Sequence, residues 1–317
     1  MHRGSTLLRI RTQLCYEAYT IWLFTRSDLK TIVIPKSIFG VLGALSRSNL
    51  VTHASDSVQN SIARAPLVVL WVWIVLLPFN IDNQRRAEAI EEDKVNRPWR
   101  PLPSKRLTPR HASQIMLIGH IVGIAYCLIV GGLRQKLVGI VLGWVYNELG
   151  AADRSCIGKN AVNALGYVTF SMGAISVAAD GSFTACGLQW FVMIGCVVFT
   201  TVQMQDLTDM EGDSLRGRRT VPLVIGSRPC RWSIAVLVPF WTLAAAWFWG
   251  TVSLPAVLSG FAAISVCWRV LRKANILEDR LTFRVWNLWI VTMYAMPLAN
   301  GVNPWSYWLA RSHGYES

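Results

Sequence analysis

Nine mostly apolar segments are spread along this chain, and most are long enough to cross a lipid bilayer as a helix. A spanning helix needs roughly 20 such residues. The composition agrees, because only 15% of the residues are charged while 53% are hydrophobic, a balance that is rare in soluble proteins. We therefore predict an all-α polytopic membrane protein. The expected spans are 31–49, 65–83, 112–131, 136–150, 161–180, 186–205, 232–251, 254–271 and 284–303.

The cationic side chains fall mainly in every second connection between these spans. The connections after the second, fourth, sixth and eighth spans are rich in arginine and lysine, whereas the others hold few. Cytosolic loops carry such an excess, so the pattern predicts nine spans with a cytosolic N-terminus. The formal charge of +13 then reflects the orientation of the chain in the membrane. We therefore expect a lipid bilayer, not nucleic acid, as the partner of this basic chain.

The first 30 residues differ from the spans that follow. Arg3, Arg9 and Arg11 precede a moderately apolar segment that Glu17 interrupts, and no small-residue cleavage site follows. These features predict a retained amphipathic helix at the membrane surface. No low-complexity linker divides residues 1–317, so we expect one transmembrane domain. The seven cysteines are scattered, with neither disulfide nor zinc spacing.

A dense cluster of charge follows the second span, in the segment NQRRAEAIEEDKVNRPWRPLPSKRLTPR from Asn83 to Arg110. This first acidic cluster holds eight cations and four carboxylates, those of Glu88, Glu91, Glu92 and Asp93. Charge of this density beside a bilayer is costly unless something binds it. Taken alone, the cluster also fits a solvated cytosolic loop that only sets the topology.

A second acidic cluster, QDLTDMEGDSLRGRRT from Gln205 to Thr220, follows the sixth span. On a helix, Asp206, Asp209 and Asp213 stand at i, i+3 and i+7, so we expect their carboxylates to share one face. Three like charges on one face repel, and a divalent cation relieves that repulsion. Together the two clusters predict a Mg²⁺ site that holds a diphosphate.

The expected roles follow from residue type and position. The expected metal ligands are Glu88, Glu92, Asp93, Asp206, Asp209 and Asp213, and among these we expect Glu92, Asp93, Asp206 and Asp209 to be catalytic. The expected substrate contacts are Asn83, Gln84, Lys94, Asn96, Arg97, Arg100, Lys159, Asn163, Arg216 and Arg218. Cations and Mg²⁺ neutralise the charge that develops when a diphosphate leaves. The allyl cation left behind needs a dry pocket with aromatic faces, for which the span tryptophans Trp71, Trp73, Trp144, Trp190, Trp241, Trp247, Trp286 and Trp289 are candidates.

At these residues the chain resembles the UbiA superfamily of intramembrane prenyltransferases. The matching segments are EDKVNRPWRPLPSKRLT, from Glu92 to Thr108, and QDLTDMEGDSLRGRRTVP, from Gln205 to Pro222. The resemblance implies nine transmembrane helices around a central cavity. It also implies that Asp-rich motifs after helices 2 and 6 bind Mg²⁺ and a prenyl diphosphate.

The first motif departs from the common UbiA pattern. Ala89 stands where the middle aspartate belongs, and Asn83 with Gln84 comes about ten residues before Asp93. With LFTRSDLKT and YNELGAADR, this variant resembles a fungal branch that includes a membrane-bound sesquiterpene cyclase. The branch implies a farnesyl diphosphate substrate, cyclisation, and an endoplasmic reticulum membrane with the site facing the cytosol. It leaves open which of Glu88, Glu92 and Asp93 touches metal.

Three functions remain after these steps. The first is a terpene cyclase, and the second is a prenyltransferase that uses the same ionisation but needs an aromatic or other acceptor. The third is a carrier or receptor that binds cations without chemistry. A carrier usually places charged residues near the bilayer midplane, whereas nearly all charges here are expected at one rim. The enzyme hypotheses are therefore favoured, with the cyclase first.

Overall fold

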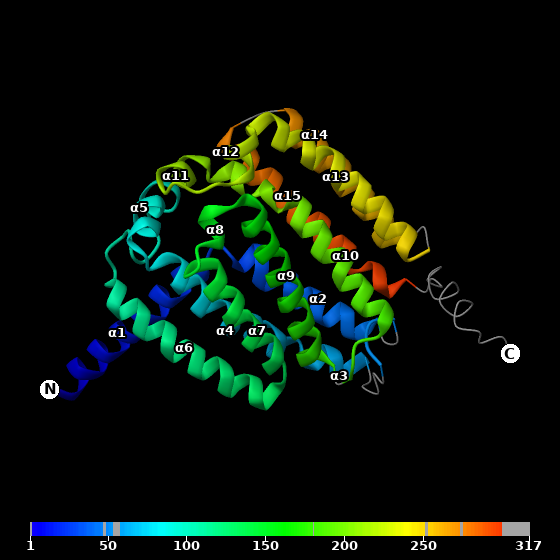
Figure 1. The fold of residues 1–317 in the computed structure, drawn as a ribbon. Helices are drawn as coiled ribbons and strands as arrows, with labels where there is room; N and C mark the ends of the chain where they lie inside the picture. The colour runs from blue at the N-terminus through cyan, green and yellow to red at the C-terminus, as the bar shows by residue number, and fades with distance from the viewer. Residues whose placement is uncertain are drawn as a thin grey trace.

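The computed structural model describes residues 2–46, 49–52, 58–179, 181–250, 253–272 and 275–299, and within them the chain is helical with no β-strand. Figure 1 shows long helices side by side, with several of the short helices gathered at one end. The long helices are α1 (His2–Thr25), α4 (Ala65–Gln84), α6 (Pro109–Val130), α7 (Leu133–Asn147), α9 (Cys156–Ala178), α10 (Ala185–Thr201), α13 (Ser227–Phe248), α14 (Leu254–Arg272) and α15 (Ile276–Tyr294). The shorter α-helices are α2 (Ile34–Leu45), α3 (Val58–Ala63), α5 (Ala87–Asn96), α8 (Ala151–Arg154), α11 (Met210–Leu215) and α12 (Val221–Ile225).

Six of the described helices are long and apolar enough to cross a membrane: α4, α6, α9, α10 with its continuation to Thr208, α13 and α14. The all-α membrane fold is thus confirmed, whereas the count of nine spans stays a prediction. The other three expected spans fall on α2, α7 and α15, of which α2 has 12 residues and α7 has 15. Residues 47–48, 180, 251 and 300–303 of the expected spans lie outside the described residues.

Local sequence sets where several helices begin. The side chains of Thr108, Ser155, Thr184 and Asn275 each accept a hydrogen bond from the backbone N–H three residues later, at the starts of α6, α9, α10 and α15. Such caps satisfy backbone donors that a helix leaves unpaired. Between α6 and α7, Gly131 and Gly132 both have positive φ, at 101° and 76°, which lets the chain reverse direction in two residues.

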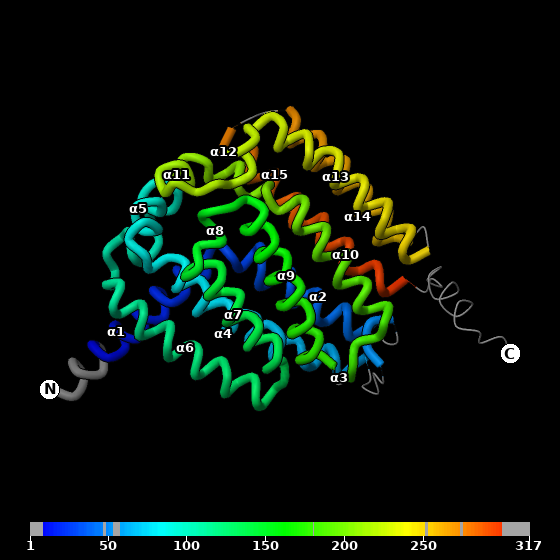
Figure 2. The backbone as a smooth tube through the Cα atoms, viewed as in Figure 1, coloured from blue at the N-terminus to red at the C-terminus, as the bar shows by residue number. Residues whose placement is uncertain are grey.

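Helix α9 packs against α2, α4, α7 and α10 and is central in the bundle. Small residues allow the close contacts: a Cβ on Gly40 of α2 would come within 2.8 Å of the Ala174 backbone, and a Cβ on Gly173 would overlap the buried ring of Trp71. One core fills the space among α9, α10, α13, α14 and α15, and a second lies between α2, α4 and α9. Figure 2 traces this arrangement along the backbone.

The two acidic clusters meet at one end of the bundle. Helix α5 carries part of the first cluster and α11 part of the second, and the two helices pack against each other. Figure 1 shows them together, with α8 and α12 nearby. A Cβ on Gly212 of α11 would overlap the Asn96 side chain of α5, so glycine permits this close approach. The fold therefore joins segments more than 100 residues apart in sequence.

Candidate active site

A cavity of about 1220 Å³ opens beneath the two clusters. Its apolar part is lined by side chains of α4, α7 and α9, and its polar part by α5 and the segment from Gln205 to Arg218. Twelve of the predicted site residues line it: Asn83, Gln84, Glu92, Asn96, Arg97, Arg100, Lys159, Asn163, Asp206, Asp209, Asp213 and Arg218. The combination of a polar mouth and an apolar interior suits an amphiphilic ligand.

The second acidic cluster does not form the single helix that we predicted. Asp206–Thr208 is a 3-10 turn, Asp209 has φ −118° and ψ 9°, and the α-helix α11 begins only at Met210. The shared helical face was therefore wrong, because the backbone leaves α geometry at Asp209. The three carboxylates nevertheless line the same cavity, since the break redirects the chain around its rim.

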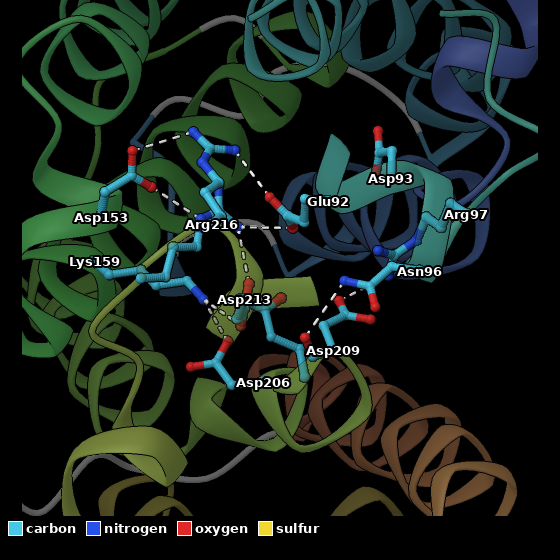
Figure 3. A network of polar contacts seen from close by, with 12 residues as sticks. Glu92, Asp93, Asn96, Arg97, Asp153, Lys159, Asp206, Asp209, Asp213 and Arg216 are labelled. Carbon is cyan, nitrogen blue, oxygen red and sulfur yellow. Dashed lines mark hydrogen bonds and ion pairs between the residues drawn. The ribbon is translucent and has the colours of Figure 1, made fainter. Parts of the chain in front are cut away.

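Arginine side chains join the two clusters across the site (Figure 3). Arg216 Nη1 lies 3.0 Å from Glu92 Oε2, and Arg218 Nη1 lies 3.3 Å from Glu92 Oε1. In the reverse direction, Arg97 of the first cluster donates to Asp209 Oδ2 over 2.9 Å. Each cluster therefore supplies cations to the carboxylates of the other.

Asp153 of α8 belongs to the same network, although the sequence reasoning assigned it no role. It accepts from Arg216 Nη2 at 3.2 Å and from Arg218 Nε at 2.9 Å. Its position in the segment YNELGAADR, which belongs to the resemblance described above, is the signal that the sequence offers. Asp153 holds both guanidinium groups toward the first cluster.

Lys159 of α9 reaches the opposite wall of the site. Its ammonium group lies 2.6 Å from Asp206 Oδ1 and 4.0 Å from Asp213 Oδ2, and all three side chains are buried. Arg218 adds a contact of 3.2 Å to Asp213 Oδ1. Buried charges are stable only when paired in this way, so the chain's own cations hold these carboxylates.

Several buried polar atoms around the cavity have no hydrogen-bond partner. The acceptors are Asn83 Oδ1, Gln84 Oε1, Asp206 Oδ2 and Asp213 Oδ2, and the donors include Asn163 Nδ2 and Arg218 Nη2. An unpartnered buried polar atom costs about 1–3 kcal/mol, so a cluster of them calls for a ligand. Oxygen acceptors suit a hard cation such as Mg²⁺, and N–H donors suit phosphate oxygens.

The described residues contain no group of three His, Cys, Asp or Glu side chains placed to enclose a metal ion. This agrees with Mg²⁺ bound together with substrate, because Mg²⁺ at phosphate sites commonly takes one or two protein carboxylates, with water and phosphate oxygens completing its shell. Asp206 Oδ2 and Asp213 Oδ2 are the carboxylate oxygens left over for such an ion. The donor set would therefore fit Mg²⁺ bound together with a diphosphate.

A family model for UbiA prenyltransferases matches residues 54–291. The chain belongs to this family. It is 26% identical over 282 residues to a fumagillin beta-trans-bergamotene synthase of Aspergillus fumigatus, covering 88% of this chain and 91% of that one. It is also 29% identical to a somaliensene A/B synthase of Streptomyces somaliensis, covering 89% and 93% of the two chains. A UbiA homologue of Archaeoglobus fulgidus, solved with GPP and Mg²⁺, has a similar fold, with a TM-score of 0.59 at 13% identity over 88% of this chain and all of that one.

Three predicted residues of the first UbiA motif lie away from the cavity. Glu88 is exposed on α5, and Lys94 is exposed and pairs with Glu91 at 2.6 Å. Asp93 is buried behind the cavity wall, where Arg100 Nη1 contacts both of its oxygens, at 2.8 and 2.9 Å. Asp93 thus fixes Arg100, which does line the cavity.

Burial and charge set the protonation of the UbiA site carboxylates outside the spans. Burial raises the pKa of Asp213 to about 6 despite nearby cations. Burial also raises the pKa of Asp93. At Asp209 burial alone would raise the pKa, but Arg97 and the Thr208 hydroxyl together hold it below the ordinary value. The lowered pKa keeps Asp209 ionised, whereas Asp213 titrates close to neutrality.

The interior of the UbiA cavity is apolar and aromatic. Phe79, Tyr146, Tyr167 and Phe170 line it, and of the eight candidate tryptophans only Trp71 and Trp144 do so. Trp190, Trp286 and Trp289 are instead buried in the core shared by α10, α13, α14 and α15. The sequence could not separate lining from packing tryptophans, because both kinds follow the same helical spacing.

Two ionisable residues deeper in the UbiA cavity were also missed. His120 of α6 and Lys136 of α7 both line it, and Lys136 Nζ lies 3.4 Å from His120 Nδ1. The signal was present in the sequence, since both stand inside apolar segments that we expected to span the bilayer. An ionisable side chain at that depth is costly and is usually functional.

Proposed function

We propose that this UbiA-family chain is a Mg²⁺-dependent terpene cyclase that ionises farnesyl diphosphate and closes it to a sesquiterpene. The observation that carries the proposal is the set of unpartnered buried atoms at the mouth of an aromatic cavity. Support for cyclisation comes from the two relatives, which are terpene synthases matched over almost their whole length. Support for Mg²⁺ and a prenyl diphosphate comes from the GPP and Mg²⁺ bound by the Archaeoglobus homologue.

In the proposed mechanism, the mouth of the cavity holds the diphosphate. Asp206 and Asp213, with the amide oxygens of Asn83 and Gln84, would hold Mg²⁺, which supplies Lewis-acid stabilisation of the leaving group. Arg218 and Asn163 have free N–H donors for phosphate oxygens. Arg218 is fixed by ion pairs with Glu92, Asp153 and Asp213 before substrate arrives, so little reorganisation of its guanidinium group is needed when negative charge develops.

The apolar interior holds the hydrocarbon chain. Once the C–O bond breaks, the aromatic faces of Tyr167, Phe170 and Trp71 stabilise the allyl cation. The cavity wall also keeps water away, so that an internal double bond attacks the cation first. We place this mouth on the cytosolic face, because the cationic connections lie on the same side as the acidic clusters. The resemblance to the fungal branch supports the endoplasmic reticulum as the membrane.

A prenyltransferase is the second proposal, and the size of the cavity leaves room for the acceptor that it needs. A volume of about 1220 Å³ exceeds the roughly 300–1,000 Å³ of most ligand pockets. Such a space accommodates either one folded prenyl chain of some length or a prenyl chain with an acceptor. The two functions share the ionisation step and differ in the nucleophile.

The test uses microsomes that contain the chain, with Mg²⁺ and farnesyl diphosphate but no acceptor. The cyclase proposal expects a cyclic hydrocarbon by gas chromatography, and no product in EDTA. Recovery of unreacted substrate or its alcohol alone would instead favour the prenyltransferase. Geranyl and geranylgeranyl diphosphate, run in parallel, report the preferred chain length.

Substitutions make the same assay specific for the site. Asp206→Ala and Asp209→Ala should abolish product while the protein still accumulates in the membrane. Glu91→Ala is the matched control, because Glu91 is an exposed carboxylate of α5 that pairs with Lys94 on its own helix and does not line the cavity. Unchanged turnover in the two aspartate variants would contradict both enzyme proposals.

A further inference from the structure

His120 and Lys136 form a polar pair inside the hydrophobic part of the cavity. His120 lies midway along α6, which spans Pro109–Val130, and Lys136 lies near the start of the neighbouring helix α7. Lys136 Nζ is 3.4 Å from His120 Nδ1, and both residues line the cavity. The pair is thus separate in position from the arginines, Lys159 and carboxylates at the mouth.

The pair is held in place by close packing. Lys136 is only 1% exposed, and its side chain crosses α6 at Gly123, where a Cβ would come within 3.2 Å of Lys136 Cε. Among the described residues, Lys136 takes part in no ion pair. Besides the pair itself, the titratable groups that act electrostatically are Asp82 on His120 and Cys127 on Lys136. Asp82 is itself engaged, by Arg85 Nε at 2.8 Å and Asn147 Nδ2 at 2.9 Å.

The proposed ionisation and cyclisation steps use neither residue. Those steps end in a carbocation, and a hydrocarbon product forms only when a C–H bond beside the cationic carbon breaks. The electron pair of that bond becomes the new double bond, and the proton needs an acceptor. A basic nitrogen within an apolar cavity meets this need, whereas water there would capture the cation and give an alcohol.

We propose that His120, in contact with Lys136, accepts the proton that ends the reaction. In the tautomer that the step uses, Nδ1 carries the hydrogen and donates it to the uncharged Lys136 amine, so Nε2 has the free lone pair that accepts the proton. The imidazolium that forms donates its Nδ1–H to the Lys136 amine, so the new charge is shared within the pair. After the product leaves, the proton returns to water. This assignment rests on the proposed cyclase function.

The step requires the pair to be uncharged when the carbocation forms. An unpaired ammonium in an apolar site carries a large desolvation cost, which an uncharged amine avoids. Lys136 is therefore a positioning residue that orients the imidazole, and His120 is the catalytic residue of this step. General bases in enzymes contribute about 10²- to 10⁴-fold to the step that they serve.

The experiment compares His120→Gln and Lys136→Met with His111→Gln. His111 is the matched control, since it is a histidine on the same helix α6 that is exposed and does not line the cavity. Two rates are measured with farnesyl diphosphate and Mg²⁺: release of diphosphate, which reports ionisation, and formation of each terpene product by gas chromatography with mass spectrometry.

For His120→Gln we expect diphosphate release within about threefold of wild type, while the native hydrocarbon falls about tenfold or more relative to diphosphate. Alcohols, or alkenes formed by proton loss elsewhere, should replace it. Lys136→Met should shift products in the same direction but less, and His111→Gln should change nothing. A merely structural role would lower release and product together and leave their ratio unchanged.

The assignment would be overturned if both His120→Gln and Lys136→Met kept the wild-type ratio of hydrocarbon to diphosphate. A parallel fall of hydrocarbon formation and diphosphate release would overturn it as well. If His120→Gln does not accumulate, Lys136→Met decides on the same criterion. Failure of the cyclase proposal looks different, because wild-type protein would then form no cyclic hydrocarbon in the absence of an acceptor.

Discussion

Arg216 Nη1 of the second acidic cluster lies 3.0 Å from Glu92 Oε2 of the first, across 124 positions of sequence. Arg218 reaches the other oxygen of the same carboxylate. Both guanidinium groups also contact Asp153. Glu92 therefore joins α5 to the chain after α11, and it helps to fix Arg218, which lines the cavity.

Glu92→Gln should reduce diphosphate release by about 10- to 100-fold, the usual effect of losing a partner that orients a ligand-binding group. The reason is that Arg216 and Arg218 would keep only Asp153 as their shared carboxylate. Initial rates at saturating Mg²⁺ provide the measurement. Glu91→Gln is the neighbouring control and should stay within about twofold, because its carboxylate is exposed and outside the network. Equal losses in the two variants would exclude a role for the Glu92 contacts.

Asp213 should make the metal-free protein less stable as the pH rises. Burial raises its native pKa to about 6 from the ordinary 3.8, so between these values the native chain keeps a proton that the unfolded chain has lost. The contribution of Asp213 to stability is therefore complete below pH 3.8 and declines up to pH 6. By pH 7 the loss amounts to roughly 3 kcal/mol.

Thermal unfolding in EDTA at pH 4.5 and pH 7 tests this expectation against Asp213→Asn. The variant should gain stability relative to wild type at the higher pH, because it cannot acquire the buried charge. With Mg²⁺ and a prenyl diphosphate present, wild type should be more stable than Asp213→Asn at pH 7, since the ionised carboxylate then has a ligand. An identical pH response in the two proteins in EDTA would contradict the expectation.

The sequence predicted the membrane fold and most of the cavity mouth, for physical reasons that act locally. Apolar runs of bilayer length identify spans, and carboxylates beside a bilayer identify a binding site. It could not predict which atoms pair. Arg100 engages Asp93 and Arg97 crosses to Asp209, although the two arginines stand three positions apart with similar surroundings in sequence. The helix break at Asp209 likewise depends on contacts made only in the fold.

A bidentate ion pair away from the cavity provides a prediction for stability alone. Arg231 of α13 donates from Nη1 to Asp279 Oδ1 at 2.7 Å and from Nη2 to Asp279 Oδ2 at 2.6 Å, and both residues are buried. Removing one partner leaves the other charge buried, at a cost of about 3–5 kcal/mol. Asp279→Ala should therefore unfold at a clearly lower temperature in detergent.

The double variant Arg231→Met with Asp279→Leu separates the pair from its burial cost. It removes both charges, so it should recover much of the stability lost in Asp279→Ala. Neither side chain lines the cavity, and the product profile of the surviving enzyme should stay the same in every variant. A double variant less stable than Asp279→Ala would show that the pair itself supplies the stability.

Helix α9 offers two glycines with opposite surroundings. A Cβ on Gly173 would overlap the ring of Trp71, which is 0% exposed, whereas a Cβ on Gly166 would meet no atom within 4 Å. Overpacking of this kind costs about 1–3 kcal/mol, and Trp71 cannot move freely because its Nε1 donates to Cys127 Sγ at 3.1 Å. Gly173→Ala should therefore lower the apparent melting temperature by several degrees.

Gly166→Ala isolates the effect of the added methyl group on the helix itself. Alanine favours a helix over glycine by about 1 kcal/mol, so this variant should be as stable as wild type or slightly more so. Because Trp71 lines the cavity, Gly173→Ala should also change the ratio of terpene products, through displacement of the indole ring. If Gly173→Ala changed neither the melting temperature nor the product ratio, α9 and α4 would have to separate easily. That outcome would contradict the tight packing of these two helices, on which the shape of the cavity depends.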